Sequence, residues 1–195
     1  IADSAFYYCT KVSRINWNAK SVANLYEKTA AFNYVGRNVS GTTVVFGEDV
    51  EKIPDYALAA YLTSSYPKIT NIIIGNNVKS IGRAAFQGCH DLTNITFGRS
   101  VQNIGRFAFL NCTSLTSIVI PEKVTYIDNV VFSGCTNLSS ITLPNSIKSI
   151  HSDAFEQCSN LKDIYFNGTY SQWSYITIYS GDDTITKANF MEVFL

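Results

Sequence analysis

The stretch VTYIDNVVFSGCTNLSSITLP, from Val124 to Pro144, contains a pattern that the chain repeats. Its Phe132–Cys135 segment reads Phe-x-x-Cys, and this segment recurs every 23 residues at Phe86–Cys89, Phe109–Cys112 and Phe155–Cys158. A fixed period of this length is typical of a solenoid, in which each repeat buries its apolar face against its neighbours. The period therefore predicts the fold, and it makes a binding surface the leading function.

Other apolar positions keep the same register, so that one unit reads V-x-x-I-x-x-x-A-F-x-x-C-x-x-L-x-x-I-x-[FIL]. The L-x-x-I-x-[FIL] part matches a short strand whose alternate side chains point into the core. The A-F-x-x-C part is too short for an independent helix, so we expect one helical turn or a 3₁₀ piece on the opposite wall. The expected fold is an α/β leucine-rich-repeat solenoid of short parallel strands. Its strands start near residues 15, 44, 72, 95, 118, 141, 164 and 188.

The whole chain reads as one solenoid with four parts. We expect a partial repeat at 1–17, irregular repeats with insertions at 18–77, regular 23-residue repeats at 78–166 and a C-terminal cap at 167–195. Within the irregular part, the units at 18–43 and 54–68 lack Phe-x-x-Cys. The chain also begins in the middle of a unit, so we expect a longer protein.

Composition limits the classes of partner. The formal net charge is zero and 15% of the residues are charged, against about 25% in ordinary globular domains. No basic field exists to hold a phosphate backbone, so nucleic acid is not an expected partner. No apolar stretch is long enough to span a membrane. A neutral surface rich in Ser, Thr and Asn suits an extracellular or cell-surface protein.

The five cysteines all occupy one slot of the repeat: Cys9, Cys89, Cys112, Cys135 and Cys158. A metal site needs paired ligands such as Cys-x-x-Cys, and the sequence has none. Buried thiols behave as small hydrophobes. The spacing therefore predicts a ladder of reduced, packed thiols, with an occasional disulfide between neighbours as the alternative.

No catalytic constellation emerges from the residues. His151, Ser152 and Asp153 are the three residue types of a triad, but adjacent side chains cannot adopt triad geometry. The sequence has no Walker loop, G-x-S-x-G or H-E-x-x-H motif. We therefore expect neither an enzyme nor a cofactor, and only the acidic pairs Glu48–Asp49 and Asp182–Asp183 offer a weak case for ion binding.

The unit resembles the BspA-type leucine-rich repeat, found in surface proteins of bacteria and trichomonad parasites. The stretch Val124–Pro144 matches that repeat almost position for position, and the resemblance covers nearly the whole chain. The segment Tyr165–Trp173 resembles one that often closes such arrays. The resemblance implies adhesion to proteins of a host or of other cells, and it brings no catalytic residues.

Residues between the inward positions of each strand should face outward and form one continuous sheet face. The expected ligand-binding residues on this face are Asn71, Asn94, Thr96, Ser117, Val119, Ser140, Thr142, Asp163 and Tyr165. Tyr165 is the leading contact, because aromatic residues anchor interfaces disproportionately. The alternative is a face that is merely solvated.

The cap offers a second candidate surface. We expect Trp173 and Ile176 to cover the end of the core, with Tyr170, Tyr175 and Tyr179 around them. The alternative is an exposed aromatic patch that contacts glycans or proteins.

Two functions remain. The first is a non-enzymatic protein-binding module of a cell-surface protein, which adheres to extracellular or host proteins such as matrix or plasma glycoproteins. The second is a structural spacer that presents another domain of a longer surface protein.

Overall fold

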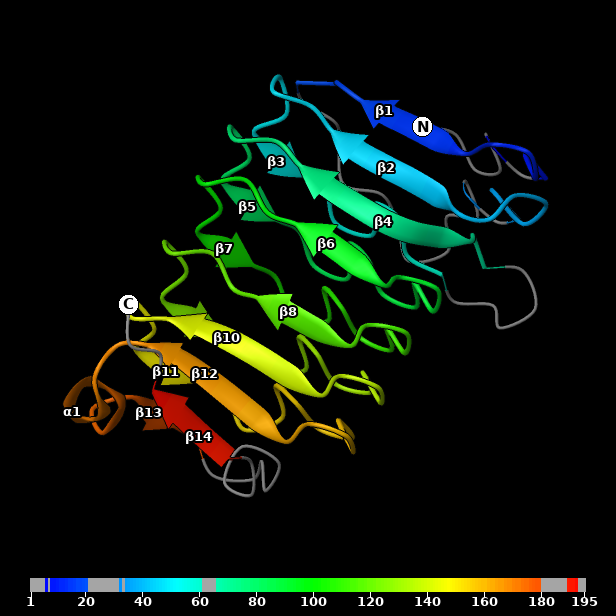
Figure 1. Ribbon diagram of the computed structural model, residues 1–195. Helices are drawn as coiled ribbons and strands as arrows, with labels where there is room; N and C mark the ends of the chain where they lie inside the picture. The colour runs from blue at the N-terminus through cyan, green and yellow to red at the C-terminus, as the bar shows by residue number, and fades with distance from the viewer. Residues whose placement is uncertain are drawn as a thin grey trace.

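The computed structural model describes residues 6, 8–20, 32, 34–60, 66–179 and 189–192. Strands stack in chain order from the N-terminal to the C-terminal end of a solenoid (Figure 1). The long strands form the main wall: β1 (Arg14–Trp17), β2 (Thr42–Phe46), β4 (Ile69–Ile74), β6 (Asn94–Thr96), β8 (Ser117–Val119), β10 (Ser140–Pro144), β12 (Asp163–Asn167) and β14 (Asn189–Glu192). The eight strand positions expected from the sequence are confirmed.

A second ladder of two-residue strands lies behind the first, and the sequence analysis did not predict it (Figure 1). Its members are β3 (Lys52–Ile53), β5 (Ser80–Ile81), β7 (Asn103–Ile104), β9 (Tyr126–Ile127), β11 (Ser149–Ile150) and β13 (Thr177–Ile178). All strand pairs in both ladders are parallel. Four of the short strands use the Ile that follows the opening Val of a unit, as Ile104 follows Val101, and β11 uses Ile150 after Ile147.

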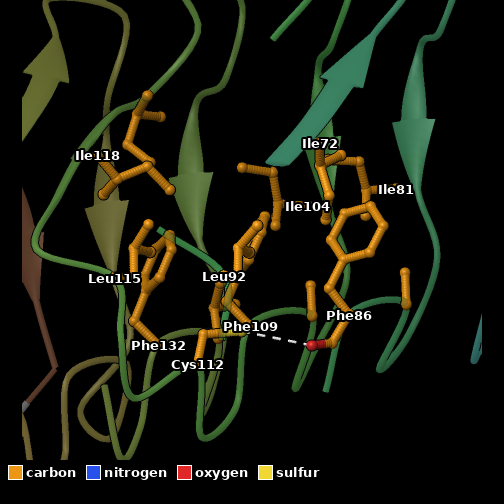
Figure 2. Packing of buried hydrophobic residues seen from close by; sticks show 14 of the residues in the cluster. Ile72, Ile81, Phe86, Leu92, Ile104, Phe109, Cys112, Leu115, Ile118 and Phe132 are labelled. Atoms are coloured by element: carbon orange, nitrogen blue, oxygen red, sulfur yellow. Dashed lines mark hydrogen bonds between the residues drawn. The ribbon is translucent and has the colours of Figure 1, made fainter. Parts of the chain in front are cut away.

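Burial alternates along the long strands as the repeat pattern requires. In β10, Ile141 and Leu143 are buried, while Ser140 and Thr142, which alternate with them along the strand, are partly exposed. Period-two alternation leaves one face of the wall in the core and the other in solvent. Figure 2 shows the core that results, with Phe, Leu and Ile side chains of successive rungs packed against one another.

The Phe-x-x-Cys segments are tight turns, so the expected helical turn or 3₁₀ piece is wrong. The Cys112 amide donates to the Phe109 carbonyl at 3.1 Å, and the other units repeat this bond. The third residue of the turn has positive φ, as at Gly88 (72°), Asn111 (59°) and Gly134 (70°). Gly and Asn tolerate this left-handed region best, which is why the short segment closes without a helix.

One irregular unit does contain the turn, in a form that the sequence analysis missed. Phe32 and Val35 are buried in the core, and the Val35 amide donates to the Phe32 carbonyl at 3.1 Å. Tyr34 has φ 63°, the same conformation that Tyr8 adopts in the preceding turn. Val therefore replaces Cys, and the substitution hid the match.

Each ladder is interrupted at the same repeat boundary. The long strands form two four-stranded sheets, ordered β1-β2-β4-β6 and β8-β10-β12-β14. The short strands form two three-stranded sheets, β3-β5-β7 and β9-β11-β13. The solenoid therefore consists of two halves that meet between β6 and β8, where Figure 1 shows the gap between neighbouring strands.

Candidate protein-binding face

The outward residues of the long strands lie in two rows that cross successive rungs. In the C-terminal half one row contains Ser117, Ser140 and Asp163, which are aligned by strand register. The second row contains Val119 and Thr142, and Tyr165 follows Thr142 on β12. Strand register thus brings these predicted residues side by side on one surface.

The N-terminal half carries the matching rows. Asn71 lies beside Asn94, and Ile73 lies beside Thr96. The sequence analysis expected a single continuous sheet face, and this expectation is wrong, because the pairing stops between β6 and β8. The candidate residues therefore lie on two sheets, with the boundary between Thr96 and Val119.

The face is shallow and almost uncharged. Asn94, Thr96, Ser117 and Val119 are exposed, and Val119 keeps 62% of its surface accessible. Among the nine predicted residues only Asp163 carries a charge. Small neutral side chains leave the wall accessible to an extended partner, and they favour contacts by shape and hydrogen bonding over charge pairing.

Tyr165 is less accessible than its predicted role as the leading contact of the binding face requires. Its side chain is half-buried, and β14 pairs alongside with Met191 opposite Tyr165. Part of its surface is therefore already covered within the fold. Val119, which is mostly exposed at the boundary between the two sheets, is the more accessible apolar residue.

The cap matches the first of the two expectations for it. Trp173 packs against Phe166 with ring centroids 5.5 Å apart, and Ile176 is partly buried against the core. Thr169 begins α1 (Tyr170–Trp173) with a capping box that includes Gln172. Tyr170, Tyr175 and Tyr179 are exposed beside this plug, so the aromatic surface that the alternative describes is present as well.

The cysteine column is buried and reduced, as the sequence predicts. Each of the four buried thiols donates to a carbonyl of the preceding rung, as Cys112 Sγ does to Phe86 O at 3.3 Å (Figure 2) and Cys135 Sγ does to Phe109 O at 3.2 Å. Cys9 is half-buried. Burial, with a smaller contribution from Asp91, raises the pKa of the Cys89 thiol to about 12. These thiols act as packing groups that also join neighbouring rungs.

We expect the folded chain to be nearly inert to thiol reagents. Thiolate is the reactive form, and Cys89, Cys112, Cys135 and Cys158 are all buried, whereas Cys9 is half-buried. Titration with Ellman's reagent at pH 8 should modify at most one thiol per folded chain and all five after denaturation. Rapid modification of two or more thiols in the folded chain would contradict the buried ladder.

The His151–Ser152–Asp153 segment joins two rungs. Asn129 Nδ2 lies 2.9 Å from His151 Nδ1 and donates to Asp153 Oδ2 at 2.9 Å. The Ser152 hydroxyl approaches the same His151 nitrogen at 3.2 Å. Both Ser152 and Asn129 therefore lie within hydrogen-bond distance of His151 Nδ1. The Asp153 carboxylate accepts from Asn129 and does not orient the histidine, as the acidic member of a triad would.

The acidic pair Glu48–Asp49 also connects rungs. Glu48 Oε1 accepts from the Asn76 amide at 3.2 Å, and the Glu48 carbonyl accepts from Asn77 Nδ2 at 2.7 Å. Within the described residues, no group of three or more metal-ligating side chains comes together. The pair Asp182–Asp183 lies outside those residues.

No described helix is long and apolar enough to cross a bilayer. None of the curated proteins matches the chain. Three solved structures of bacterial proteins resemble this chain.

The first is a leucine-rich cell surface protein from Faecalibacterium prausnitzii, with 25% identity and a TM-score of 0.66 over 87% of this chain. The second is the leucine-rich repeat protein of T. pallidum, with 27% identity and a TM-score of 0.59 over 73% of this chain and 70% of that one. The pneumococcal vaccine antigen PcpA, 17% identical, shares the fold with a TM-score of 0.55 over 82% of this chain and 43% of its own.

The chain spans 52% of the length of the Faecalibacterium protein. The family model of the BspA-type leucine-rich repeat region matches in six copies, over residues 1–65 and 59–184. The match covers nearly the whole chain and agrees with the stacked parallel strands. The chain belongs to the BspA-type leucine-rich repeat family.

Proposed function

We propose that this chain is a protein-binding module of a cell-surface protein and that it adheres to host or neighbouring-cell proteins through the strand face. The observation that supports this most is the pair of aligned rows of small, uncharged, accessible side chains on β4, β6, β8, β10 and β12. Family membership and the likeness to a leucine-rich cell surface protein support the cellular location.

The strand face is better suited to protein than to nucleic acid or small ligands. The wall lacks the clustered Lys and Arg that a phosphate backbone requires. Proteins bind one another through broad, shallow surfaces of this kind, whereas small molecules bind in enclosed, largely apolar cavities. A structural spacer is the competing function, and it predicts that the same face binds nothing.

Charged substitutions on the face separate the two functions. The variant N94K/S117K/S140K adds three positive charges to β6, β8 and β10, at positions that are exposed or partly exposed. We expect it to bind immobilised matrix and plasma glycoproteins at least tenfold more weakly than the wild-type chain, as measured by surface plasmon resonance. Lysine side chains there would obstruct close approach and would require desolvation.

The matched control carries the same added charge away from the face. Gln102, Thr125 and Ser159 are exposed and lie outside the long strands, so Q102K/T125K/S159K should keep wild-type affinity within about twofold. Equal losses in both variants would point to non-specific electrostatics. Absence of saturable binding to every protein of the panel would favour the spacer.

A further inference from the structure

A cleft opens on the strand face where the two sheets meet. It has a volume of about 460 Å³, and its walls include Thr96 and Phe97 from one side and Val119 and Ile120 from the other. That volume lies within the range of about 300–1,000 Å³ found for ligand sites. The cleft therefore lies in the middle of the candidate face and contains two of its predicted residues.

The cleft exposes part of the apolar core. Ile95 is half-buried, whereas the residues in the same slot of other rungs, Ile72, Ile118 and Ile141, are almost fully buried. Phe97 is likewise half-buried, whereas Ile120 is buried in the next rung. Ile95 of β6 and Phe97 directly after it thus lack the cover that their counterparts receive.

Glycines bring the rungs on the N-terminal side of this boundary unusually close together. A Cβ on Gly75 would lie 2.8 Å from the Phe46 carbonyl oxygen, and a Cβ on Gly98 would lie 2.2 Å from the Gly75 carbonyl oxygen. The backbones of neighbouring rungs are therefore so close at Gly75 and Gly98 that no side chain fits at either position. Pro121 takes the slot that follows Gly98, and it brings a ring and lacks an N–H donor.

The short ladder changes at the same boundary. A Cβ on Gly105 would meet the backbone of Gly82 and Arg83 at 2.8 Å. Asp128 occupies the next position in that column. The two glycine columns, Gly75–Gly98 and Gly82–Gly105, therefore both end at the rung that contains β6 and β7. Both ladders are interrupted after that rung.

The two halves remain joined on the opposite wall. The Phe109 amide donates to the Val131 carbonyl at 2.9 Å, and the Asn111 amide donates to the Ser133 carbonyl at 2.9 Å. The Phe109 and Phe132 rings stack 5.3 Å apart. The cleft is thus a wedge that is closed at the Phe-x-x-Cys turns and open at the strand face.

Two strand edges face this wedge. β6 pairs with β4 and β8 pairs with β10, but no strand pairing joins β6 to β8 in the described part of the chain. Free strand edges offer backbone donors and acceptors to an added strand. A strand that pairs with either edge needs about 9.6 Å between the strands that flank it, whereas Cα atoms of β6 and β8 lie within 8 Å of one another. The wedge must therefore open by about 2 Å to admit a peptide, which would then satisfy these groups and cover Ile95 and Phe97.

The charges in the cleft point to a neutral occupant. Its walls carry one cation, Arg99, and one anion, Glu122, so their formal charges cancel. Glu122 Oε1 also accepts from Asn167 Nδ2 at 3.3 Å, which holds this carboxylate across two rungs. A strongly charged segment would gain no net attraction here, whereas a neutral one would lose little on desolvation.

We propose that the cleft between β6 and β8 binds an extended, uncharged segment of a partner protein. The backbone of this segment would pair with a free strand edge, and its apolar side chains would contact Ile95, Phe97 and Val119. The inference rests on the proposed protein-binding function and specifies the chemistry of the partner. It also explains why Val119 is exposed at this position in the array.

The test uses a disulfide that closes the wedge in a reversible way. Thr96 and Val119 occupy equivalent slots of neighbouring rungs, as Val119 and Thr142 do in the intact sheet. T96C/V119C would therefore join β6 to β8, and V119C/T142C is the matched control that joins two strands already paired. Both variants lose Val119 and one threonine of the same row, so they are matched except for the position of that threonine and for which strands are joined.

The probe is the capped, fluorescein-labelled peptide KTVTITVTK, whose alternating pattern suits an extended strand. We expect saturable binding of this peptide to the wild-type chain, measured as an increase in fluorescence anisotropy. Affinity should fall at least tenfold in oxidised T96C/V119C and recover on reduction, while oxidation should leave V119C/T142C unchanged. The peptide KTVTPTVTK should bind at least tenfold more weakly, because proline removes a central donor.

Three results would overturn the inference: no saturable binding of KTVTITVTK, equal binding of the proline peptide, or equal affinity of the two oxidised variants. The glycoprotein panel separates this failure from failure of the proposed function. If oxidised T96C/V119C keeps panel binding that N94K/S117K/S140K loses, the face binds proteins but the cleft does not. If the wild-type chain binds nothing on the panel, the proposed function itself fails.

Discussion

The substitution Phe109→Ala should lower the free energy of unfolding by about 3–5 kcal/mol, the usual cost of removing a fully buried phenylalanine. The Phe109 ring lies 5.3 Å from both the Phe86 and the Phe132 ring, and Phe97 contacts it edge-on at 6.2 Å. Its loss would leave a cavity at the wall that joins the two halves. Urea denaturation followed by circular dichroism measures the change.

Phe107→Ala is the matched control, because it removes the same ring two residues away. Phe107 is half-buried and lies between Arg83 and Arg106, whose guanidinium carbons are 5.1 and 5.2 Å from its centroid. Cation–π contacts at exposed sites contribute about 0.5–1 kcal/mol each. We expect a cost of about 1–2 kcal/mol, and equal costs for both variants would contradict the phenylalanine stack as the core of the solenoid.

Gly98→Ala should destabilise the fold by about 1–3 kcal/mol, a typical cost of overpacking. The added Cβ would lie 2.2 Å from the Gly75 carbonyl oxygen, so the backbone of one of the two rungs must move. This residue does not have positive φ, and the expected loss is therefore steric and not conformational. Thermal and urea unfolding of the two chains measure the difference.

Pro121→Ala tests the same column one rung later. Pro121 already has a side chain and is partly exposed at the cleft. Replacing proline increases the entropy of the unfolded chain, which costs about 0.4–1 kcal/mol. If Pro121→Ala proved as costly as Gly98→Ala, the glycine column would not be what brings the N-terminal rungs so close together.

The repeat register could be predicted from the sequence because each unit places the same residue types in the same slots. Ile118, Ile141 and Ile164 recur with one period, and alternation within each strand then fixes which neighbours face outward. The same argument placed the cysteines in one buried column, because they share a slot beside Phe. Strand positions, core and outward face therefore follow from local pattern alone.

The interrupted sheet could not be predicted in this way. It depends on contacts between rungs: position 98 has room only for glycine, because the Gly75 carbonyl lies directly against it, and Pro121 ends the glycine series. A pattern of apolar residues carries no information about such backbone approach. Two features of the sequence nevertheless mark the boundary. Pro121 stands in the slot that Gly98 occupies one repeat earlier, and Asp128 stands in the slot that Gly105 occupies one repeat earlier.

Other misses have local causes. The two-residue strands of the second ladder are too short to show a periodicity. The turn at Phe32–Val35 was hidden because Val replaces Cys. The Phe-x-x-Cys segment predicts one helical turn or a 3₁₀ piece, but it forms a tight turn with positive φ at its third residue. At Gln157 and Tyr8 the residue type gives no sign of that conformation in the sequence.

The most direct test of the account compares dissociation constants of three chains for the tightest-binding glycoprotein of the panel. If the strand face binds the partner, N94K/S117K/S140K binds at least tenfold more weakly than the wild-type chain, while Q102K/T125K/S159K stays within about twofold. Wild-type affinity in N94K/S117K/S140K would contradict the strand face as the binding surface.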